Sequence, residues 1–129
     1  MSDSPNVAVA RRMYDAKGDP AVIQEVMAPD IVWDITPGFP NGGVYHGLDS
    51  VVNDFFGPLF GRFDAFYPVA EEFYADGDHV IALGHYQGST KTGKNVQVRF
   101  IHLWTIREGK LARLQQAADS LVVDRALNG

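Results

Sequence analysis

The spacing of apolar residues changes along the chain and divides it into a helical part and a β part. In the helical part, apolar positions recur every three or four residues, which is typical of amphipathic helices. This spacing predicts a first helix that ends at Gly18, and a second that begins at Asp19-Pro20 and stops at Pro29-Asp30. Asp is a preferred N-cap, and Pro is tolerated in a first helical turn. The buried positions of these two helices are Val7, Ala10, Met13, Tyr14, Val22, Ile23, Val26 and Met27.

A short strand, a loop and a third helix follow in the pattern. Residues 31–35, which are apolar except for Asp34, form a segment of strand length. Residues 36–43 are rich in Gly and Pro, which is typical of a mobile loop near a pocket mouth. Residues 48–60 return to helical spacing. Their apolar positions are Leu48, Val51, Val52, Phe55, Phe56 and Leu59.

From Phe63 onward, the signals are those of antiparallel strands. Asp76-Gly77 and Glu108-Gly109 are hairpin turns. They join residues 72–75 to 79–86, and residues 96–106 to 111–118. Helices set apart from a mostly antiparallel sheet define an α+β domain. We expect the sheet to be strongly curved, so that it wraps around the three N-terminal helices and leaves a conical cavity.

Two histidines, His85 and His102, lie in strands on either side of one predicted turn. A two-residue loop at Gly93-Lys94 would place them directly opposite each other, and one at Thr92-Gly93 would place them diagonally. Because side chains alternate with a period of two, both loops put the two imidazoles on one sheet face. The same reasoning places Leu83, Val98, Phe100 and Trp104 on that face, and turns Tyr86 outward.

Composition excludes several classes of protein. The chain has 129 residues, 46% of them hydrophobic, a net charge of −5 and no cysteine. The basic residues are scattered, so we expect no nucleic-acid binding, which needs a concentrated basic stripe. No apolar run reaches the length of a membrane span, and residues 1–5 lack the basic and apolar regions of a secretory signal. We therefore expect a cytoplasmic protein without membrane contact, disulfides or Cys-ligated metal.

Six short segments together resemble the SnoaL-like and ketosteroid-isomerase-like proteins of the nuclear transport factor 2-like superfamily. They are RRMYDA at 11–16, GD at 18–19, APDIVW at 28–33, YHGLDSV at 45–51, ADGDHV at 75–80 and WTIREGKL at 104–111. The resemblance implies that residues 1–129 form a single SnoaL-like domain with a cone-shaped, cystatin-like α+β barrel. It does not specify a reaction, because this fold carries isomerases, cyclases, epoxide hydrolases and non-enzymatic binders.

The resemblance also indicates which familiar catalytic groups are missing. Where steroid isomerases carry an oxyanion-stabilising acid, this chain has His102, and near the position of their tyrosine it has Met13. The position of their aspartate base corresponds closely to Ile35, with Asp34 one residue away. Limonene epoxide hydrolases need an Asp–Arg–Asp network. At the corresponding positions this chain has His85, Leu83 and Gln116, so the arginine and both acids are absent. The comparison implies that His85, His102 and Gln116 point into one cavity.

These inferences define the candidate site. We expect His85 and His102 to be the catalytic residues, because imidazole transfers protons near neutral pH. The expected substrate-binding residues are Trp33, Phe55, Leu83, Phe100, Trp104 and Gln116. We expect no cofactor and no metal, since the two histidines lack an obvious third ligand. Asp119 is an acid near the rim, a solvated acid or a helix cap.

Three functional hypotheses remain open from sequence. The first is a protein that binds a small apolar organic molecule, with an isomerase or cyclase step carried out by the histidines. The second is a non-catalytic ligand-binding or interaction domain with the same cavity, in which the histidines only fix the orientation of the ligand. A structural alternative for the pair is that both imidazoles are core-edge groups with satisfied hydrogen bonds. The third is a metal-dependent enzyme.

The face opposite His102 suggests a further partner. Gln97, Arg99, Ile81, Ile101 and Leu103 lie there, and the set is more apolar than a solvated face should be. We expect a homodimer that covers this outer sheet face.

Overall fold

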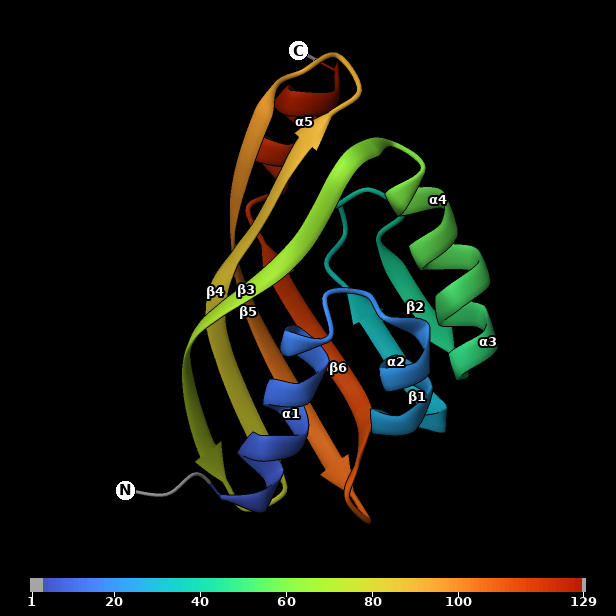
Figure 1. Ribbon diagram of the computed structural model, residues 1–129, viewed down its shortest axis with the longest axis vertical. Helices are drawn as coiled ribbons and strands as arrows, with labels where there is room; N and C mark the ends of the chain where they lie inside the picture. Colours follow the sequence, from blue (N-terminus) through green and yellow to red (C-terminus); the bar gives the residue numbers. More distant parts are fainter. Residues whose placement is uncertain (1–3, 129) are drawn as a thin grey trace.

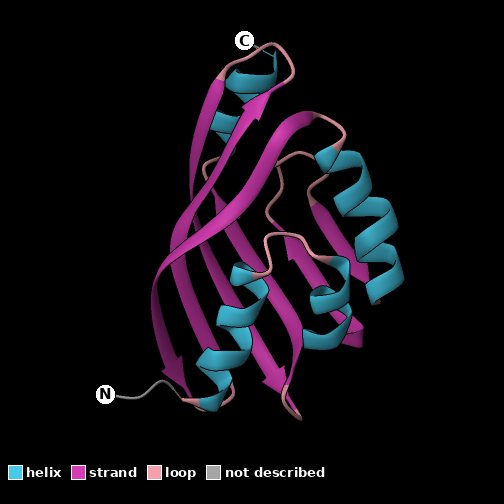
Figure 2. Ribbon diagram, in the orientation of Figure 1, coloured by secondary structure: helices cyan, strands magenta, loops and turns pink. Residues whose placement is uncertain are grey.

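A curved, unclosed sheet of six strands forms the frame of the computed structural model, and helices cover its concave face (Figures 1 and 2). The structure describes residues 4–128. Residues 1–3, part of the segment inspected for a secretory signal, lie outside this range. The helices are α1 (Pro5–Asp15), α2 (Pro20–Val26), α3 (Leu48–Ser50), the π-helical η1 (Val51–Phe56), α4 (Gly57–Phe60) and α5 (Ser120–Asn128). The strands are β1 (Met27–Ile35), β2 (Gly43–His46), β3 (Phe63–Asp76), β4 (His79–Thr90), β5 (Asn95–Arg107) and β6 (Lys110–Ala118).

Side-chain caps start the first two helices, and the cap of the second is the one that the sequence predicts. Ser4 accepts a hydrogen bond from the Val7 backbone N–H at the start of α1. Asp19 caps α2 in the same way through the Ala21 N–H, and Pro20 occupies the first turn. The second helix ends earlier than predicted, because Met27 is already extended and begins β1. Sheet pairing with β6 therefore overrides the helical spacing of Met27.

The predicted third helix, residues 48–60, is present as the continuous run α3, η1 and α4. Its middle is π-helical. Pro58, which has no backbone N–H to donate, lies two residues after the end of this wider segment. The run buries Val51, Phe55 and Leu59.

The strands form the sheet in the order β2-β1-β6-β5-β4-β3. The predicted antiparallel meander of β3 to β6 is confirmed, and β1 joins it in parallel to β6. Two elements are absent from the sequence prediction, namely β2 and the C-terminal helix α5. The first is four residues long and immediately follows the Gly-rich loop, so its sequence carries little alternation. The architecture is α+β, as predicted.

The hairpin between β4 and β5 differs from both predicted loops. Ser89 pairs with Asn95, the Thr90 N–H donates to the Lys94 carbonyl, and the Gly93 N–H donates to the Thr90 carbonyl. Three residues, 91–93, therefore form the loop, and Gly93 has the positive φ of 88° that such a hairpin needs. A three-residue loop reverses the parity that either two-residue loop would give. Residues predicted to share a face across this hairpin therefore lie on opposite faces.

Even-numbered residues of β4 and β5 face the helices, and odd-numbered residues face away. The inward set includes Val80, Ala82, Tyr86, Val98 and Phe100, all buried. Phe39, from the Gly- and Pro-rich loop, also enters this core and packs against the rings of Phe66 and Tyr86. In residues 4–128, no helix is long and apolar enough to cross a membrane.

Candidate functional site

A cavity of about 330 Å³ lies between the third helical run, the start of β3 and the concave face of the sheet. Most of its wall is aromatic or aliphatic. The lining includes Met13, Ile23, Trp33, Phe55, Phe56, Leu59, Phe63, Phe66, Tyr86 and His102. Buried Trp33, Tyr86 and His102 form its closed end, whereas exposed Lys17, Phe60, Asp64 and Ala65 mark its mouth. The cavity is thus an apolar chamber with polar atoms at its deep end and charges at its entrance.

A chain of buried hydrogen bonds runs behind the closed end. The Trp104 indole donates to the Tyr14 hydroxyl over 2.7 Å, and that hydroxyl lies 2.6 Å from Nδ1 of His102. On the other side of the ring, His102 Nε2 lies 2.8 Å from the Tyr86 hydroxyl. Gln116 Nε2 donates to the same hydroxyl over 2.8 Å. The chain draws residues from α1, β4, β5 and β6 together at one point.

Backbone geometry orients the amide at the end of this chain. The Thr36 N–H donates to Oε1 of Gln116 over 3.3 Å, which leaves the amide nitrogen to face Tyr86. A carbonyl oxygen only accepts and an amide nitrogen only donates, so the direction of the Gln116–Tyr86 bond is set. Gln116 therefore holds the Tyr86 hydroxyl in place at the cavity wall.

His102 is enclosed by aromatic rings. Phe100 stacks on its imidazole with the ring centroids 3.8 Å apart, and Tyr14 and Trp104 close two other sides. Burial lowers the pKa of His102 from 6.5 to about 3, because the charged imidazolium loses its hydration. His102 is therefore neutral at physiological pH, and both ring nitrogens are engaged in hydrogen bonds.

The two tyrosines of the chain also stay neutral. Burial raises the pKa of Tyr86, and the hydrogen bond from Gln116 opposes this only in part. Burial likewise raises the pKa of Tyr14 well above its ordinary value. A phenol kept neutral in an apolar wall acts as a hydrogen-bond donor, not as a base.

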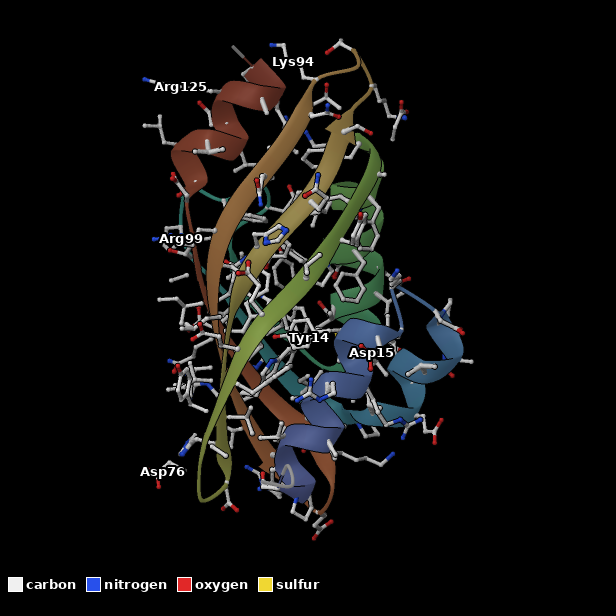
Figure 3. All side chains as sticks on the ribbon, turned by 60° about the vertical axis from the view of Figure 1, so that its left-hand side comes forward. Tyr14, Asp15, Asp76, Lys94, Arg99 and Arg125 are labelled. Carbon is white, nitrogen blue, oxygen red and sulfur yellow. The ribbon has the colours of Figure 1, made fainter. Side chains whose placement is uncertain are left out.

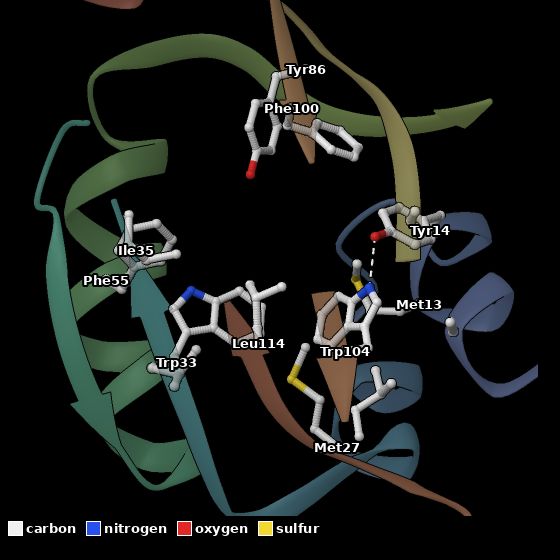
Figure 4. Packing of buried hydrophobic residues seen from close by; sticks show 14 of the residues in the cluster. Met13, Tyr14, Met27, Trp33, Ile35, Phe55, Tyr86, Phe100, Trp104 and Leu114 are labelled. Atoms are coloured by element: carbon white, nitrogen blue, oxygen red, sulfur yellow. Dashed lines mark hydrogen bonds between the residues drawn. The ribbon is translucent and has the colours of Figure 1, made fainter. Parts of the chain in front are cut away.

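Trp33 adds a polar atom without a partner. Its indole Nε1 is buried and makes no hydrogen bond within the described residues. Its ring packs against Phe55, Phe56 and Trp104, which hold it in one orientation. Figure 4 shows this nitrogen and the Tyr86 hydroxyl directed toward the same central space. An unsatisfied buried donor costs free energy, so its presence in a cavity wall calls for an explanation.

The predicted inward position of His85 is wrong. His85 pairs with Arg99, not with His102 or Phe100, and its Nδ1 lies 2.6 Å from Oε1 of Glu71 on the outer sheet face. Leu83 lies on the same outer face beside it, so it does not face the cavity either. The three-residue hairpin loop is the physical reason, because it changes the face of every β4 residue relative to β5. Figure 3 shows Arg99 on the side of the sheet opposite α1, which carries Tyr14.

The other predicted substrate-binding residues divide into two groups. Trp33 and Phe55 line the cavity. Phe100, Trp104 and Gln116 face inward but lie behind its wall, where they support His102, Tyr14 and Tyr86.

The structure also shows where the residues that correspond to catalytic positions of the steroid isomerases lie. Met13 lines the cavity and Ile35 is buried, whereas Asp34 points away from the core, 3.9 Å from Arg113. Asp119 accepts a hydrogen bond from the Val122 N–H at the start of α5, which fits the helix-cap interpretation. No group of three His, Asp or Glu side chains within residues 4–128 is placed to hold a metal ion.

Two residues of the chain, Tyr14 and Tyr86, are absent from the site that the sequence predicts. Alternation with His85 predicts that Tyr86 faces outward; the two residues do lie on opposite faces, but Tyr86 is the one that faces inward. The helical spacing places Tyr14 in the buried stripe of α1, but its distance from His102 depends on how that helix packs on the sheet. A correct register across residues 91–93 would have identified Tyr86.

Comparisons with known proteins agree on the family. A model of the SnoaL-like domain matches residues 10–114. A comparison with curated proteins finds no match. Among solved structures, a nuclear transport factor 2-like protein of Burkholderia thailandensis is 30% identical, with a TM-score of 0.87, over 99% of this chain and 100% of that chain.

Two further structures share the fold at lower identity. A putative SnoaL-like polyketide cyclase from Jannaschia sp. is 21% identical, with a TM-score of 0.85, over 100% of this chain and 98% of that one. TerC, crystallised with polyporic acid, is 24% identical, with a TM-score of 0.87, over 98% of this chain and 100% of that one. The family model covers most of the chain, and the curved sheet around its helices is the fold these structures share. The chain therefore belongs to the SnoaL-like family of the nuclear transport factor 2-like superfamily.

Proposed function

We propose that this protein binds a compact, largely apolar organic molecule in the cavity, with an oxygen of that molecule directed at Tyr86. The observation that carries the proposal is the position of a neutral hydrogen-bonding chain at the closed end of an aromatic chamber. Ligand pockets combine a mostly apolar wall with a few placed polar groups that set orientation. His102 acts in this proposal through Tyr86, as a positioning residue, and His85 has no part in it.

A cavity-filling variant tests the proposal. Ala65 lines the mouth, so Ala65→Phe should obstruct entry, whereas Ala75→Phe changes an exposed β3 residue outside the cavity. We expect bicyclic aryl ketones such as α-tetralone to raise the melting temperature of the wild type and of Ala75→Phe, but not of Ala65→Phe. Equal stabilisation of all three proteins would show that the ligand binds elsewhere.

A second candidate function is an isomerase- or cyclase-type step on a carbonyl compound, within a family that includes polyketide cyclases and isomerases. Asp64 favours it, because this carboxylate lines the same cavity as the Tyr86 hydroxyl. Enolisation needs a base near the α-carbon and a donor at the carbonyl oxygen. His102 is unsuited to be that base, because both of its ring nitrogens are already engaged in hydrogen bonds with Tyr14 and Tyr86.

Exchange of the α-protons of α-tetralone in deuterium oxide distinguishes the two candidates. For an enzyme, we expect exchange faster than in buffer, with loss of most of the acceleration in Asp64→Asn and in Tyr86→Phe. Binding without accelerated exchange would identify a non-catalytic ligand-binding protein.

A further inference from the structure

The buried chain holds more protons than it has hydrogen bonds. Its four bonds join Trp104 to Tyr14, Tyr14 to His102, His102 to Tyr86, and Tyr86 to Gln116. Five protons are available to them, one from each residue, because a neutral imidazole carries a single N–H. Both ends, the Trp104 indole and the oriented Gln116 amide, can only donate. One proton of the chain is therefore left without an acceptor.

That proton can reside at only two oxygens. If His102 carries its proton on Nε2, Tyr14 donates to Nδ1, the imidazole donates to Tyr86, and the spare proton lies on Tyr86. If His102 carries it on Nδ1, all the intervening bonds reverse and the spare proton lies on Tyr14. The tautomer of His102 thus decides which hydroxyl is unsatisfied.

The surroundings of the two hydroxyls differ. Tyr14 is packed among the rings of Phe73, Phe100, His102 and Trp104, and it does not line the cavity. Tyr86 lines the cavity. A molecule in the cavity can therefore accept the spare proton only from Tyr86, and doing so selects the Nε2–H tautomer.

Trp33 supplies a second donor to the same place. Its indole N–H has no partner among the described residues, and Figure 4 shows it directed to the space that the Tyr86 hydroxyl also faces. In the Nε2–H tautomer, the Tyr86 oxygen already accepts from His102 and Gln116. The deep end of the cavity then presents two donors and no free acceptor.

We propose that the deep end of the cavity is a donor-only site that binds a ligand oxygen lacking a proton, through Tyr86 and Trp33, and that this binding sets His102 as the Nε2–H tautomer. The inference rests on the proposed function and specifies its ligand class, a ketone or the corresponding enolate. A hydroxyl group fits less well, because its own proton would find no acceptor there.

Three probes of one shape separate the possibilities: α-tetralone, its alcohol tetralol, and the parent hydrocarbon tetralin. We expect the ketone to bind the wild type at least about tenfold more tightly than the hydrocarbon, and several-fold more tightly than the alcohol. Tighter binding of the alcohol than of the ketone would overturn the inference and leave the proposed function standing. Equal affinity for ketone and hydrocarbon would overturn the inference and also the proposed orientation of a ligand oxygen toward Tyr86. Absence of binding by all three would overturn both.

Trp33→Phe tests the second donor without leaving a protein group unpaired, since its N–H has no partner. We expect this variant to lose about three- to tenfold in ketone affinity and to keep its affinity for tetralin. Tyr74→Phe is the control, because it removes an exposed hydroxyl that is bonded to Glu72 and lies outside both the cavity and the buried chain. It should retain the preference for the ketone. An unchanged ketone affinity in Trp33→Phe would remove Trp33 from the site.

Nitrogen NMR of the imidazole tests the tautomer directly and does not depend on affinity. His102→Gln identifies the His102 signals by their loss. With α-tetralone bound, we expect Nε2 to show the shift of a protonated ring nitrogen and Nδ1 that of an acceptor. The opposite assignment in the complex would overturn the inference.

Discussion

The hydroxyl of Tyr14 lies 2.6 Å from Nδ1 of His102, although 88 residues separate them along the chain. This contact ties α1 to the centre of β5, and the Trp104 indole donates to the same hydroxyl. The pair is buried and lies behind the cavity wall, so it links the stability of the fold to the orientation of Tyr86.

Removal of the Tyr14 hydroxyl should destabilise the protein. Tyr14→Phe leaves the Trp104 N–H and His102 Nδ1 without partners in a buried site, which costs roughly 1–3 kcal/mol. Chemical denaturation followed by tryptophan fluorescence measures the loss. Tyr74→Phe is the control, because its hydroxyl bonds Glu72 at an exposed position, and we expect a change within about 0.5 kcal/mol. Equal losses in the two variants would contradict a structural role for the buried chain.

Stability should depend on pH through His102. Its pKa is about 3 in the folded protein and near 6.5 when unfolded, so the unfolded chain binds a proton that the folded protein excludes. The contribution of His102 to stability is therefore complete above pH 6.5 and is lost as the pH falls from there toward 3. The slope contributed by one such group approaches ~1.4 kcal/mol per pH unit.

The difference between wild type and His102→Gln isolates this dependence from that of the carboxylates. Glutamine can still donate and accept between the two tyrosines, so folding is preserved. We expect the unfolding free energy of the variant to fall less steeply over this pH range. Parallel pH profiles for the two proteins would contradict a neutral, buried His102.

The two histidines should behave differently toward ligand. His85 lies on the outer face beside Glu71, so His85→Ala should leave stabilisation by α-tetralone unchanged. His102→Ala removes one of the two hydrogen-bond partners of the Tyr86 hydroxyl and opens space behind the cavity wall, so it should abolish most of that stabilisation. Thermal shifts of the three proteins with and without ligand provide the measurement. Loss of the response in His85→Ala would mean that the site extends to the outer face.

Two glycines of β4 should tolerate no side chain. A Cβ at Gly84 would lie 2.0 Å from the Val69 carbonyl oxygen, and one at Gly88 would lie 2.3 Å from that of Ala65, both on the paired strand β3. Gly84→Ala should therefore destabilise the protein by roughly 1–3 kcal/mol, as overpacking does. Gly57→Ala, with only an ordinary contact at 3.6 Å, should be neutral or stabilising by up to about 1 kcal/mol, because Ala favours a helix. Thermal unfolding compares the two variants.

The outer sheet face predicts association of two copies. Ile81 and Ile101 are 39% and 48% exposed there, and the same face carries acidic Glu72 and basic Arg99, which a two-fold axis can bring together. We expect light scattering after gel filtration to give the mass of a dimer, and Ile101→Lys to give that of a monomer. Val52→Lys is the control, since Val52 is 40% exposed on η1, away from this face. A monomeric wild type would contradict the prediction.

Local signals in the sequence determined much of the fold. The Asp19 cap, the apolar spacing of residues 48–60 and the Gly-containing turns act over a few residues, so they are readable without tertiary structure. Glu108 and Gly109 both have positive φ in the last hairpin, as a two-residue turn requires. The inward positions of His102 and Gln116 and the family resemblance also follow from the chain itself.

Only the tertiary structure decided which residues meet. The loop at residues 91–93 contains one residue more than either predicted turn, and that single residue turns His85 and Leu83 away from the cavity and leaves Tyr86 facing it. The approach of Tyr14 to His102 depends on how α1 packs across the sheet, which no local spacing encodes. Sequence therefore determined most of the elements and, within each strand or helix, which residues share a face, because these depend on local periodicity. The structure determined the site, because register and packing bring together residues that are far apart in the chain.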